Sequence, residues 1–291
     1  MTSRSLDERA GRACFVKCEN LQTTGSFKIR GAMNFARSLP ETERGRGLVA
    51  FSSGNHGQAV AMAARVMGVA ATIIMPRDAP QSKLQATRDR GATVITYDRF
   101  TEDREAIGRR VAGETGAALA PPFDHPWTIA GQGTLALELL EDVPGLDTLV
   151  VCVGGGGMVS GCSLIAKEMA PGIRVYGVEP ELANDTFLSL QAGHRVKVDA
   201  SGTIADGLRS PMPGELTFAI MQRNLSGVLT VSEAEILEAM RFLLGRMKLL
   251  AEPSGAVCVA AALAGKLPAE SRRVGLVISG GNVDLEILRM L

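Results

Sequence analysis

Short apolar runs alternate with longer amphipathic stretches along most of the chain. The apolar runs have strand length, are rich in β-branched residues and are apolar on both faces, as in parallel strands that helices cover on two sides. This alternation predicts an α/β fold with parallel sheets and right-handed crossovers. Strands are expected at Cys14–Cys18, Leu48–Phe51, Ala71–Met75, Thr93–Tyr97, Thr148–Val153, Arg174–Val178, Gly227–Val231 and Val274–Ile278.

The stretches between these runs carry apolar residues at helical spacing. Most of them begin after small or polar residues that suit the start of a helix. Helices are expected at His56–Met67, Ser82–Arg90, Glu102–Thr115, Gly133–Leu140, Val159–Met169, Glu233–Leu249 and Gly255–Leu263.

Two segments rich in glycine or proline indicate crossings between domains. Residues 44–47 precede the second expected strand, and residues 120–126 follow a self-contained run of strand–helix units. We therefore expect a large domain formed by residues 1–46 and 125–291, with residues 47–124 inserted as a small domain. Inserted domains of this kind often close over a ligand.

The composition argues against several classes of partner. Lys+Arg and Asp+Glu each number 31 among the 291 residues, so no electrostatic reason exists to expect nucleic acid or an anionic membrane. No apolar run is long enough to span a bilayer, and the first residues lack the apolar centre of a signal peptide. Five scattered cysteines favour buried thiols over disulfides, so a cytoplasmic protein is expected.

Lys28 is the first candidate for chemistry. It follows Phe27 at what reads as the start of a helix, flanked by apolar residues and glycines. Burial beside an aromatic ring disfavours the ammonium form and frees the amine to attack carbonyl groups. This segment alone is equally compatible with a solvated lysine in the first turn of an amphipathic helix.

Three glycine-rich turns follow expected strands: Ser52–Gly57, Gly154–Met158 and Ser279–Asn282. Free backbone amides at a helix start bind carboxylates and phosphates, although the first turn also suits a simple helix cap. Four consecutive glycines cost chain entropy that a plain turn does not require, which favours an anion cradle. Turns at the carboxyl ends of strands are expected to gather in one crevice, together with Gly207.

A dinucleotide site is the competing interpretation of the second turn. Gly155 and Gly157 fit part of the G-x-G-x-x-G pattern, but Ser160 stands where the third glycine belongs. A nicotinamide site also gives no role to Lys28, so we regard this interpretation as the weaker one.

In this order and spacing, the motifs resemble those of fold-type-II pyridoxal-phosphate enzymes, specifically the serine/threonine dehydratase and serine racemase family. The resemblance covers nearly the whole chain. It implies a two-lobed, tryptophan synthase β-like fold with parallel-rich sheets covered by helices, and a homodimer. The motifs that carry it are residues 18–22, 26–28, 52–57, 130–134, 154–157, 179–180, 205–207, 246–253 and 279–282.

The resemblance also assigns roles around pyridoxal phosphate. Lys28 would carry the cofactor as a Schiff base and act as the α-proton base, with Phe27 packed on the ring. The remaining cofactor contacts that it implies are Asn55, Gly154, Gly155, Gly156, Gly157, Met158, Gly207, Glu252 and Ser279, the last at the pyridine nitrogen. A serine cannot hold that nitrogen protonated as a carboxylate would, so the ring is a weaker electron sink.

For the substrate, the resemblance implies binding of the α-carboxylate at the first glycine turn. The expected substrate contacts are Ser52, Ser53, Gly54, Asn55, His56, Arg104 and Ser210. Arg104 matches an arginine that can approach a second carboxylate, which makes 3-hydroxyaspartate a candidate substrate. The surrounding sequence is equally compatible with an exposed helix residue at this position.

A divalent-cation site is implied at Glu179, Ala183 and Asp185, through two carboxylates and a backbone carbonyl. Oxygen ligands completed by water suit Mg²⁺ or Ca²⁺. Without the resemblance, two acids six residues apart are typical of a solvated surface.

The expected reaction is α,β-elimination from a hydroxy amino acid (L-threonine, L-serine or threo-3-hydroxyaspartate) to a keto acid and ammonia. The alternative is amino-acid racemisation with Lys28 and Ser53 on opposite faces of the substrate. Phe123 stands where eukaryotic serine racemases tend to have asparagine, which favours the dehydratase. A remote alternative is a non-catalytic module that binds amino acids.

Overall fold

A computed structural model describes residues 1–79 and 81–291, and the chain divides into two compact units. The large unit comprises Met1–Phe27 and Gln132–Leu291, and the small unit comprises Lys28–Gly131. The small unit therefore extends beyond the expected 47–124 at both ends. One reason is that α2 (Lys28–Ser38) packs along α4 (Asn55–Met67).

The large unit is built on a five-stranded sheet in the order β1-β9-β6-β7-β8, with every neighbouring pair parallel. The three central strands, β6, β7 and β9, are almost entirely buried, which explains why they are apolar on both faces, whereas the edge strands β1 and β8 are only partly buried. They span β1 Ala13–Cys18, β6 Thr148–Cys152, β7 Arg174–Pro180, β8 Gly227–Val231 and β9 Arg273–Ile278.

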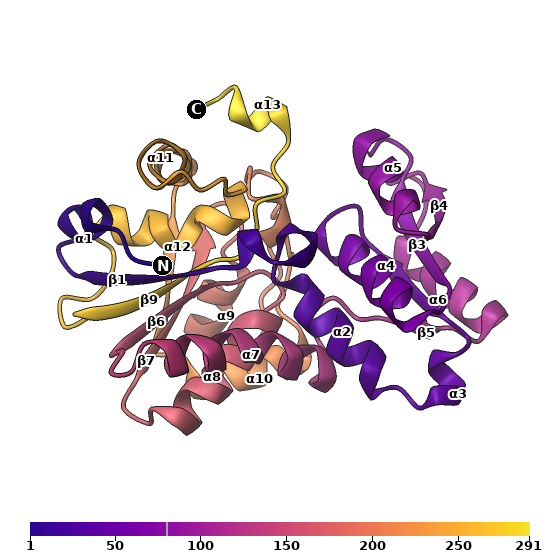
Figure 1. Cartoon of the computed structure of the whole chain (residues 1–291), viewed down its shortest axis with the longest axis horizontal. Coiled ribbons are helices and arrows are strands. Elements are labelled where there is room, and N and C mark those ends of the chain that lie inside the picture. The colour runs from indigo at the N-terminus through magenta and orange to yellow at the C-terminus, as the bar shows by residue number, and fades with distance from the viewer. Residues whose placement is uncertain (80) are drawn as a thin grey trace. The chain divides into compact units, whose positions relative to one another are not determined.

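Helices cover both faces of this sheet (Figure 1). On one face lies α12 (Pro253–Leu263), whose alanine-rich sequence is almost wholly buried against β9 and β6. Small side chains let it lie close to the strands. On the other face α8 (Gly157–Met169) packs on β6 and against α10 (Glu215–Asn224). The remaining helices here are α1 Arg4–Ala10, α9 Asp185–Ala192, α11 Glu233–Phe242 and α13 Leu285–Leu288.

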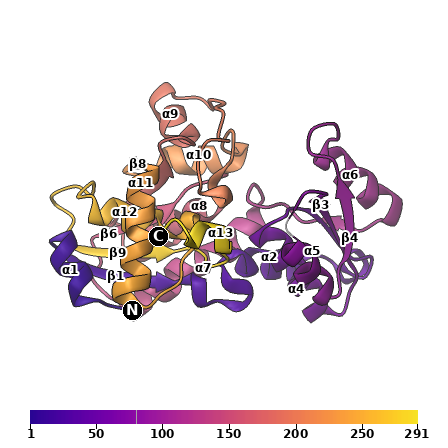
Figure 2. The same ribbon diagram turned by 90° about the horizontal axis from the view of Figure 1, so that it is seen from above.

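The small unit has a four-stranded parallel sheet in the order β4-β3-β2-β5. Figure 2 shows α4 and α6 (Arg104–Thr115) on opposite sides of it. Residues alternate between the two faces: Leu48 and Ile73 join the core with α4, and Val49 joins the core with α6. The strands span β2 Leu48–Phe51, β3 Ala71–Pro76, β4 Thr93–Tyr97 and β5 Ala118–Leu119. Two further helices are α3 Glu41–Arg44 and α5 Gln81–Asp89.

Each expected strand is present, and the α/β class with parallel sheets is confirmed. The helix expected over Gly133–Leu140 is longer, as α7 (Pro126–Asp142). The helix expected over Glu233–Leu249 was too long, because α11 ends at Phe242 and a π-helical turn, Leu243–Met247, leads to a left-handed Lys248. Within the described residues, no helix has the length and apolar character required to cross a membrane.

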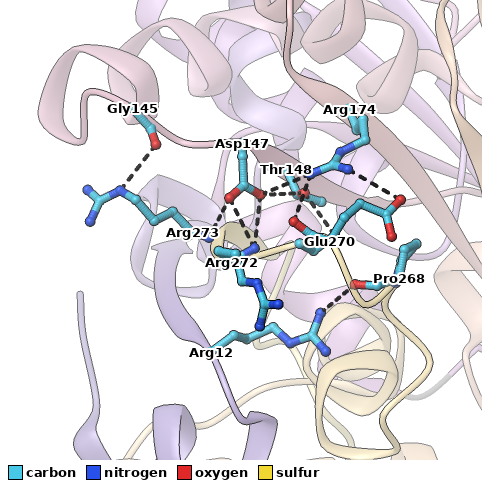
Figure 3. A network of polar contacts seen from close by, with 10 residues as sticks. Arg12, Gly145, Asp147, Thr148, Arg174, Pro268, Glu270, Arg272 and Arg273 are labelled. Carbon is cyan, nitrogen blue, oxygen red and sulfur yellow. Dashed lines mark hydrogen bonds and ion pairs between the residues drawn. The ribbon is translucent and has the colours of Figure 1, made fainter.

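A polar network closes the amino-terminal edge of the large sheet, where β6, β7 and β9 begin (Figure 3). The Asp147 carboxylate accepts hydrogen bonds from the backbone N–H groups of Arg272 and Arg273, at 3.0 and 2.8 Å, and from the Thr148 hydroxyl at 2.7 Å. The Arg174 guanidinium lies 3.6 Å from the same carboxylate. The network ties the start of β9 to the start of β6, so it serves the fold.

Candidate active site

Lys28 is the first residue of α2, and it is half-buried. Its ammonium Nζ donates a hydrogen bond to the carbonyl oxygen of Pro122 at 2.9 Å. Pro122 belongs to the irregular segment that follows β5. The amine is therefore held against the main chain of the small unit.

His56, in the first turn of α4, lies close to this lysine. Its ring is 6% exposed, and Nε2 lies 2.9 Å from the Ala120 carbonyl oxygen. Burial, reinforced by the positive charge of Lys28, lowers the pKa of His56 to about 3. His56 is therefore neutral. Because a carbonyl oxygen can only accept a hydrogen bond, the proton of the neutral ring is on Nε2, which donates the bond to Ala120. The ring is thus engaged with the main chain, so the part of His56 available to a substrate carboxylate is its backbone N–H.

The turn Ser52–Gly57 links β2 to α4. The N-cap of α4 is Gly54, and no side chain caps the first turn, so the simple cap considered above does not describe this segment. Gly57 has no room for a side chain, since a Cβ would lie 2.5 Å from the Ser52 carbonyl oxygen. The turn therefore presents backbone amides at the positive end of a helix dipole, which suits a carboxylate.

Ser53 and Arg104 line one cavity of about 380 Å³ in the small unit. Arg104 begins α6, and its guanidinium carbon lies 5.7 Å from the centre of the Phe51 ring. The other residues that line the cavity are Pro76, Tyr97, Arg99, Glu102 and Asp103. Arg99 is paired with Asp78 outside this lining, at 2.9 Å. Sequence reasoning placed Arg104 in a substrate site, and the structure puts its side chain in a cavity with Ser53.

The four-glycine turn lies at the carboxyl end of β6, in the large unit. Gly156 has φ +88°, and a Cβ there would lie 2.7 Å from Met221 Cε and 2.9 Å from Thr217 Cβ. The N-cap of α8 is Gly156, again with no capping side chain, so the amides that follow, including that of the buried Met158, are not capped. The Thr217 hydroxyl donates to the Gly155 carbonyl oxygen at 2.7 Å and thereby turns that carbonyl toward α10. The result is an amide-lined cradle for a small anion such as a phosphate.

The turn at Ser279 follows β9, the neighbour of β6, so these two glycine turns share one edge of the large sheet, as expected. The Ser279 hydroxyl is buried and donates to the Ser254 carbonyl oxygen at 3.3 Å. The Ser254 hydroxyl in turn accepts from the backbone N–H of Gly207 at 2.9 Å. Gly207 also adjoins the glycine turn, because a Cβ on Gly154 would lie 3.2 Å from its carbonyl oxygen.

Ser254 was not among the expected site residues. Its only signal in the sequence is a small polar residue in the first turn of α12, directly after Glu252 and Pro253. Glu252 is buried at the N-cap of this helix, and its backbone N–H donates to the Gly280 carbonyl oxygen at 3.1 Å. Phe27 donates from its backbone N–H to the Ser279 carbonyl oxygen at 3.0 Å. The peptide bond that follows Phe27 leads directly to Lys28.

The expected metal ligands lie at the end of β7 and the start of α9. Glu179, Ala183 and Asp185 are fully buried. Burial, with the nearby charge of Asp185, raises the pKa of Glu179 to about 8, and burial raises the pKa of Asp185 to about 7. Two backbone N–H groups, of Thr186 and Phe187, bond the Glu179 carboxylate, whereas neither Asp185 oxygen has a hydrogen-bond partner among the described residues. Uncompensated buried carboxylates fit a cation.

Ser210, the last expected substrate contact, lies in the large unit after the turn at Gly207. Its hydroxyl donates to the Met212 carbonyl oxygen at 2.9 Å. The structure thus places the expected residues in two groups. Lys28, the Ser52–Gly57 turn and Arg104 belong to the small unit, and the four-glycine turn, Ser279, Ser210 and the acidic pair belong to the large unit.

A half-buried lysine, amide-lined anion cradles at strand ends and parallel sheets define a class of α/β proteins that bind a phosphorylated cofactor. The model of the pyridoxal-phosphate dependent enzymes matches residues 1–280, and the chain belongs to this family. The family's cofactor is pyridoxal phosphate, as the motifs predict. The glycine cradle and the half-buried lysine each fit part of such a group, because uncapped amides suit a phosphate and a lysine offers an amine.

The chain is 51% identical, over 285 residues, to an L-threo-3-hydroxyaspartate ammonia-lyase of a Pseudomonas species, covering 98% of this chain and 89% of that protein. It is 46% identical to a serine racemase of Schizosaccharomyces pombe, over 98% of this chain and 88% of that protein. Among solved structures, maize serine racemase superposes with a TM-score of 0.95 at 42% identity, over 100% of this chain and 89% of that one. The relatives therefore include both ammonia-lyases and racemases.

Proposed function

We propose that the chain is a pyridoxal-phosphate dependent ammonia-lyase whose preferred substrate is threo-3-hydroxyaspartate. The observation that carries the proposal is the cavity that Ser53 and Arg104 line together. It adjoins the turn that suits an α-carboxylate, and it offers a guanidinium for a second carboxylate. The similarity to an L-threo-3-hydroxyaspartate ammonia-lyase supports the same substrate.

The residues expected to hold the cofactor come from the glycine turns and the segments next to them. Phosphate suits the amides of residues 154–158, and the Ser279 hydroxyl suits the ring nitrogen. Phe27 and Asn55 remain the expected partners of the ring and its hydroxyl, and Gly207 and Glu252 remain expected cofactor contacts. When bound, pyridoxal phosphate withdraws electrons from the α-carbon of the substrate and so acidifies its α-proton.

The chain's own residues then have separable tasks. Lys28 Nζ takes the α-proton as general base. The amides of Ser52–Gly57 hold the α-carboxylate, and Arg104 holds the distal carboxylate, so the substrate is oriented at both ends. Loss of the β-hydroxyl as water and subsequent hydrolysis convert 3-hydroxyaspartate to oxaloacetate and ammonia, with no net oxidation or reduction.

A substrate comparison tests the proposal. Keto-acid and ammonia release is measured with L-threonine, L-serine and threo-3-hydroxyaspartate, for the wild type and Arg104→Ala. We expect hydroxyaspartate to give the highest kcat/KM, and Arg104→Ala to lower that value by about 100-fold with little effect on threonine, since a charge-assisted pair is lost. Arg109→Ala is the matched control, because Arg109 lies on the same helix and pairs with Glu105.

Equal losses for all substrates in Arg104→Ala would remove the second-carboxylate role. Ligand-induced stabilisation without any keto acid would instead support the non-catalytic binding module.

Racemisation is the second candidate, and the position of Ser53 favours it. Ser53 lines the substrate cavity of the small unit rather than capping α4. A hydroxyl there can exchange a proton with the α-carbon on the face opposite Lys28. Chiral analysis of serine after incubation tests this role: Ser53→Ala is expected to abolish D-serine formation and to retain keto-acid release.

We further propose that Mg²⁺ or Ca²⁺ binds at Glu179, Asp185 and the Ala183 carbonyl oxygen. The buried, unpartnered oxygens of Asp185 support this site. No group of three or more metal-binding side chains occurs in the described part of the chain, so water or main-chain oxygens would complete the coordination. Magnesium is expected to raise the melting temperature of the wild type but not that of Asp185→Asn, with the exposed Asp199→Asn as control.

The proposed assembly is a homodimer in a reducing, cytoplasmic setting. Two leucines of the large unit, Leu21 and Leu285, are 68% and 74% exposed, so their side chains are accessible to a partner subunit. None of the five cysteines takes part in a disulfide within the described residues, which supports a reducing compartment. Light scattering tests the dimer, and Leu285→Asp is expected to shift it toward monomer.

A further inference from the structure

Three consecutive carbonyl groups in the small unit, those of Ala120, Pro121 and Pro122, each accept a hydrogen bond from a different side chain. The donors are His56 Nε2 at 2.9 Å, the Thr128 hydroxyl at 3.3 Å and Lys28 Nζ at 2.9 Å, in that order. They come from three separate helices, α4, α7 and α2. We call residues 120–122 the carbonyl row.

The carbonyl row is rigid for covalent reasons. Pro121 and Pro122 have fixed φ angles and no N–H group, so only their ψ angles can reorient their carbonyl groups and they cannot join a strand ladder through an N–H. Ala120 is anchored by its backbone N–H, which donates to the Val49 carbonyl oxygen at 2.8 Å. The orientation of the Ala120 peptide is therefore transmitted to Pro122 with few rotatable bonds between them.

The two donors other than the lysine are built into the interior. Thr128 is 1% exposed and His56 is 6% exposed. A buried histidine held neutral cannot repel the lysine ammonium, and its Nε2–H satisfies a carbonyl that would otherwise lack a partner. Burying a polar imidazole at this position is unfavourable, and an apolar side chain could fill the space without that cost.

We propose that the carbonyl row is the docking position of the Lys28 amine whenever that amine is not bonded to the cofactor, and that His56 and Thr128 are the positioning residues that hold the row in place. The role as docking position rests on the proposed function, because only a cofactor lysine alternates between bonded and free states. The hydrogen bonds themselves do not depend on it.

Docking limits the conformational freedom of the Lys28 side chain. A free lysine side chain samples many rotamers, and fixing it costs about 2 kcal/mol of conformational entropy. A carbonyl acceptor at 2.9 Å fixes the amine near the main chain of α2 and residues 120–122. His56 and Thr128 act through the row and touch no reacting atom, so they are positioning residues rather than catalytic ones.

Competitive acetylation measures docking without measuring activity. The full-length chain, stripped of cofactor, is treated with trace acetic anhydride, and acetylation of Lys28 is quantified by mass spectrometry relative to the exposed Lys197. His56→Leu is expected to raise the relative labelling of Lys28 about tenfold. Without the bond from His56 to Ala120, the row is held less firmly, and the charge-assisted hydrogen bond from Lys28 Nζ to the Pro122 carbonyl is weakened. His56→Gln is expected to stay within about twofold of the wild type, since its amide N–H can reach the same carbonyl.

Thr128→Val is the second variant, and it is expected to raise labelling about threefold, as loss of one neutral hydrogen bond implies. Its control is Thr87→Val, because Thr87 is equally buried in the small unit but donates to the Lys83 carbonyl oxygen at 2.9 Å, within α5. If His56→Leu does not fold, as judged by thermal unfolding, Thr128→Val decides.

A rise in Lys28 labelling in the folded variants, absent from Thr87→Val and restored by His56→Gln, supports the carbonyl row. Unchanged labelling in a folded His56→Leu or, failing that, Thr128→Val overturns it. Keto-acid release is measured separately. If Lys28 is labelled as expected but no keto acid is released, the proposed function is overturned, whereas the hydrogen bonds of the carbonyl row are still supported.

Discussion

The aspartates at the two ends of the large sheet differ in how their carboxylates are hydrogen-bonded. At the amino-terminal edge, Asp147 accepts hydrogen bonds from two backbone N–H groups and a hydroxyl (Figure 3). At the carboxyl-terminal edge, Asp185 is fully buried, and its oxygens have no partner among the described residues. The pKa values follow this difference. Burial alone would raise the pKa of Asp147, but the bonds from Thr148, Arg273 and Arg272 bring it below its usual range, whereas that of Asp185 is raised to about 7.

The two aspartates differ in whether their oxygens are satisfied by hydrogen bonds from the described part of the chain. A carboxylate whose lone pairs are satisfied contributes to stability, and one that is buried without partners costs stability until a cation arrives. Glycines divide in the same way. Gly145, before β6, adopts a positive φ where a Cβ would make only an ordinary contact, 3.9 Å from Arg273 Nε, whereas Gly156, after β6, adopts it where a Cβ would lie 2.7 Å from Met221 Cε.

The largest effect is expected from the lysines. Lys28→Ala should lower the keto-acid rate about 10⁴-fold or more, because the base and the cofactor attachment are lost together. Lys17→Ala should leave the rate per folded molecule unchanged, since Lys17 on β1 pairs with Glu138. Initial rates and visible absorption on the same samples distinguish the two. A Lys28→Ala protein that still turns over its substrate contradicts the assignment.

Alanine at the two glycines should produce effects of different kinds. Gly156→Ala is expected to weaken pyridoxal-phosphate binding about 100-fold, because the cradle closes and the positive φ is strained. Gly145→Ala is expected to cost about 1 kcal/mol in the free energy of unfolding, with cofactor affinity unchanged. Cofactor titration and urea unfolding measure the two quantities. Equal cofactor affinities in both variants would remove the contrast between the two turns.

The two aspartates should respond oppositely to the loss of charge. Asp147→Asn is expected to lower the free energy of unfolding by about 2–3 kcal/mol, since charge-assisted bonds are lost at the strand starts. Asp185→Asn, measured in chelator, is expected to be neutral or stabilising, because it replaces a buried carboxyl group that has no hydrogen-bond partner among the described residues and whose ionisation burial disfavours. Chemical denaturation with and without chelator gives both values. Destabilisation by Asp185→Asn in chelator would contradict the proposed role of Asp185 as a cation ligand.

The smallest effect concerns acid stability. The folded pKa of His56, about 3, lies below its unfolded value, so the unfolded chain takes up a proton first and stability falls as the pH drops below about 6.5. This histidine should account for about 2 kcal/mol of loss between pH 7 and pH 5. Asp147, with a lowered pKa, loses its contribution only below about pH 4.

Subtracting the pH profile of His56→Gln from that of the wild type isolates the histidine, because the other titrating groups are common to both. Parallel profiles between pH 7 and pH 5 would show that His56 is not held neutral.

The sequence predicts the sheets well, because strands covered on both faces must be apolar throughout, as β6 and β9 are. It predicts short surface helices poorly. The helices α1, α9 and α10 were not expected, since each owes its stability to packing against the sheet or α8 rather than to a strong apolar period. β5 was missed because two residues carry too little pattern.

The site shows the same division. The glycine turns and Lys28 stand out in the sequence, because consecutive glycines and a charged side chain in apolar surroundings are unfavourable for folding and therefore indicate a function. The Pro122 carbonyl and Ser254 do not stand out, since a main-chain acceptor has no residue signature and a small serine fits many helix starts. Glu179 and Asp185 become a buried pair only when β7 and α9 fold together.

The most direct test of the central claim is to locate the cofactor on the chain. The protein is saturated with pyridoxal phosphate, reduced with borohydride to make any lysine linkage permanent, digested and mapped by mass spectrometry. The account predicts one modified lysine, Lys28, and none in Gly156→Ala at the same cofactor concentration. Modification of Lys17, Lys83 or another lysine in place of Lys28, or of no lysine, would contradict it.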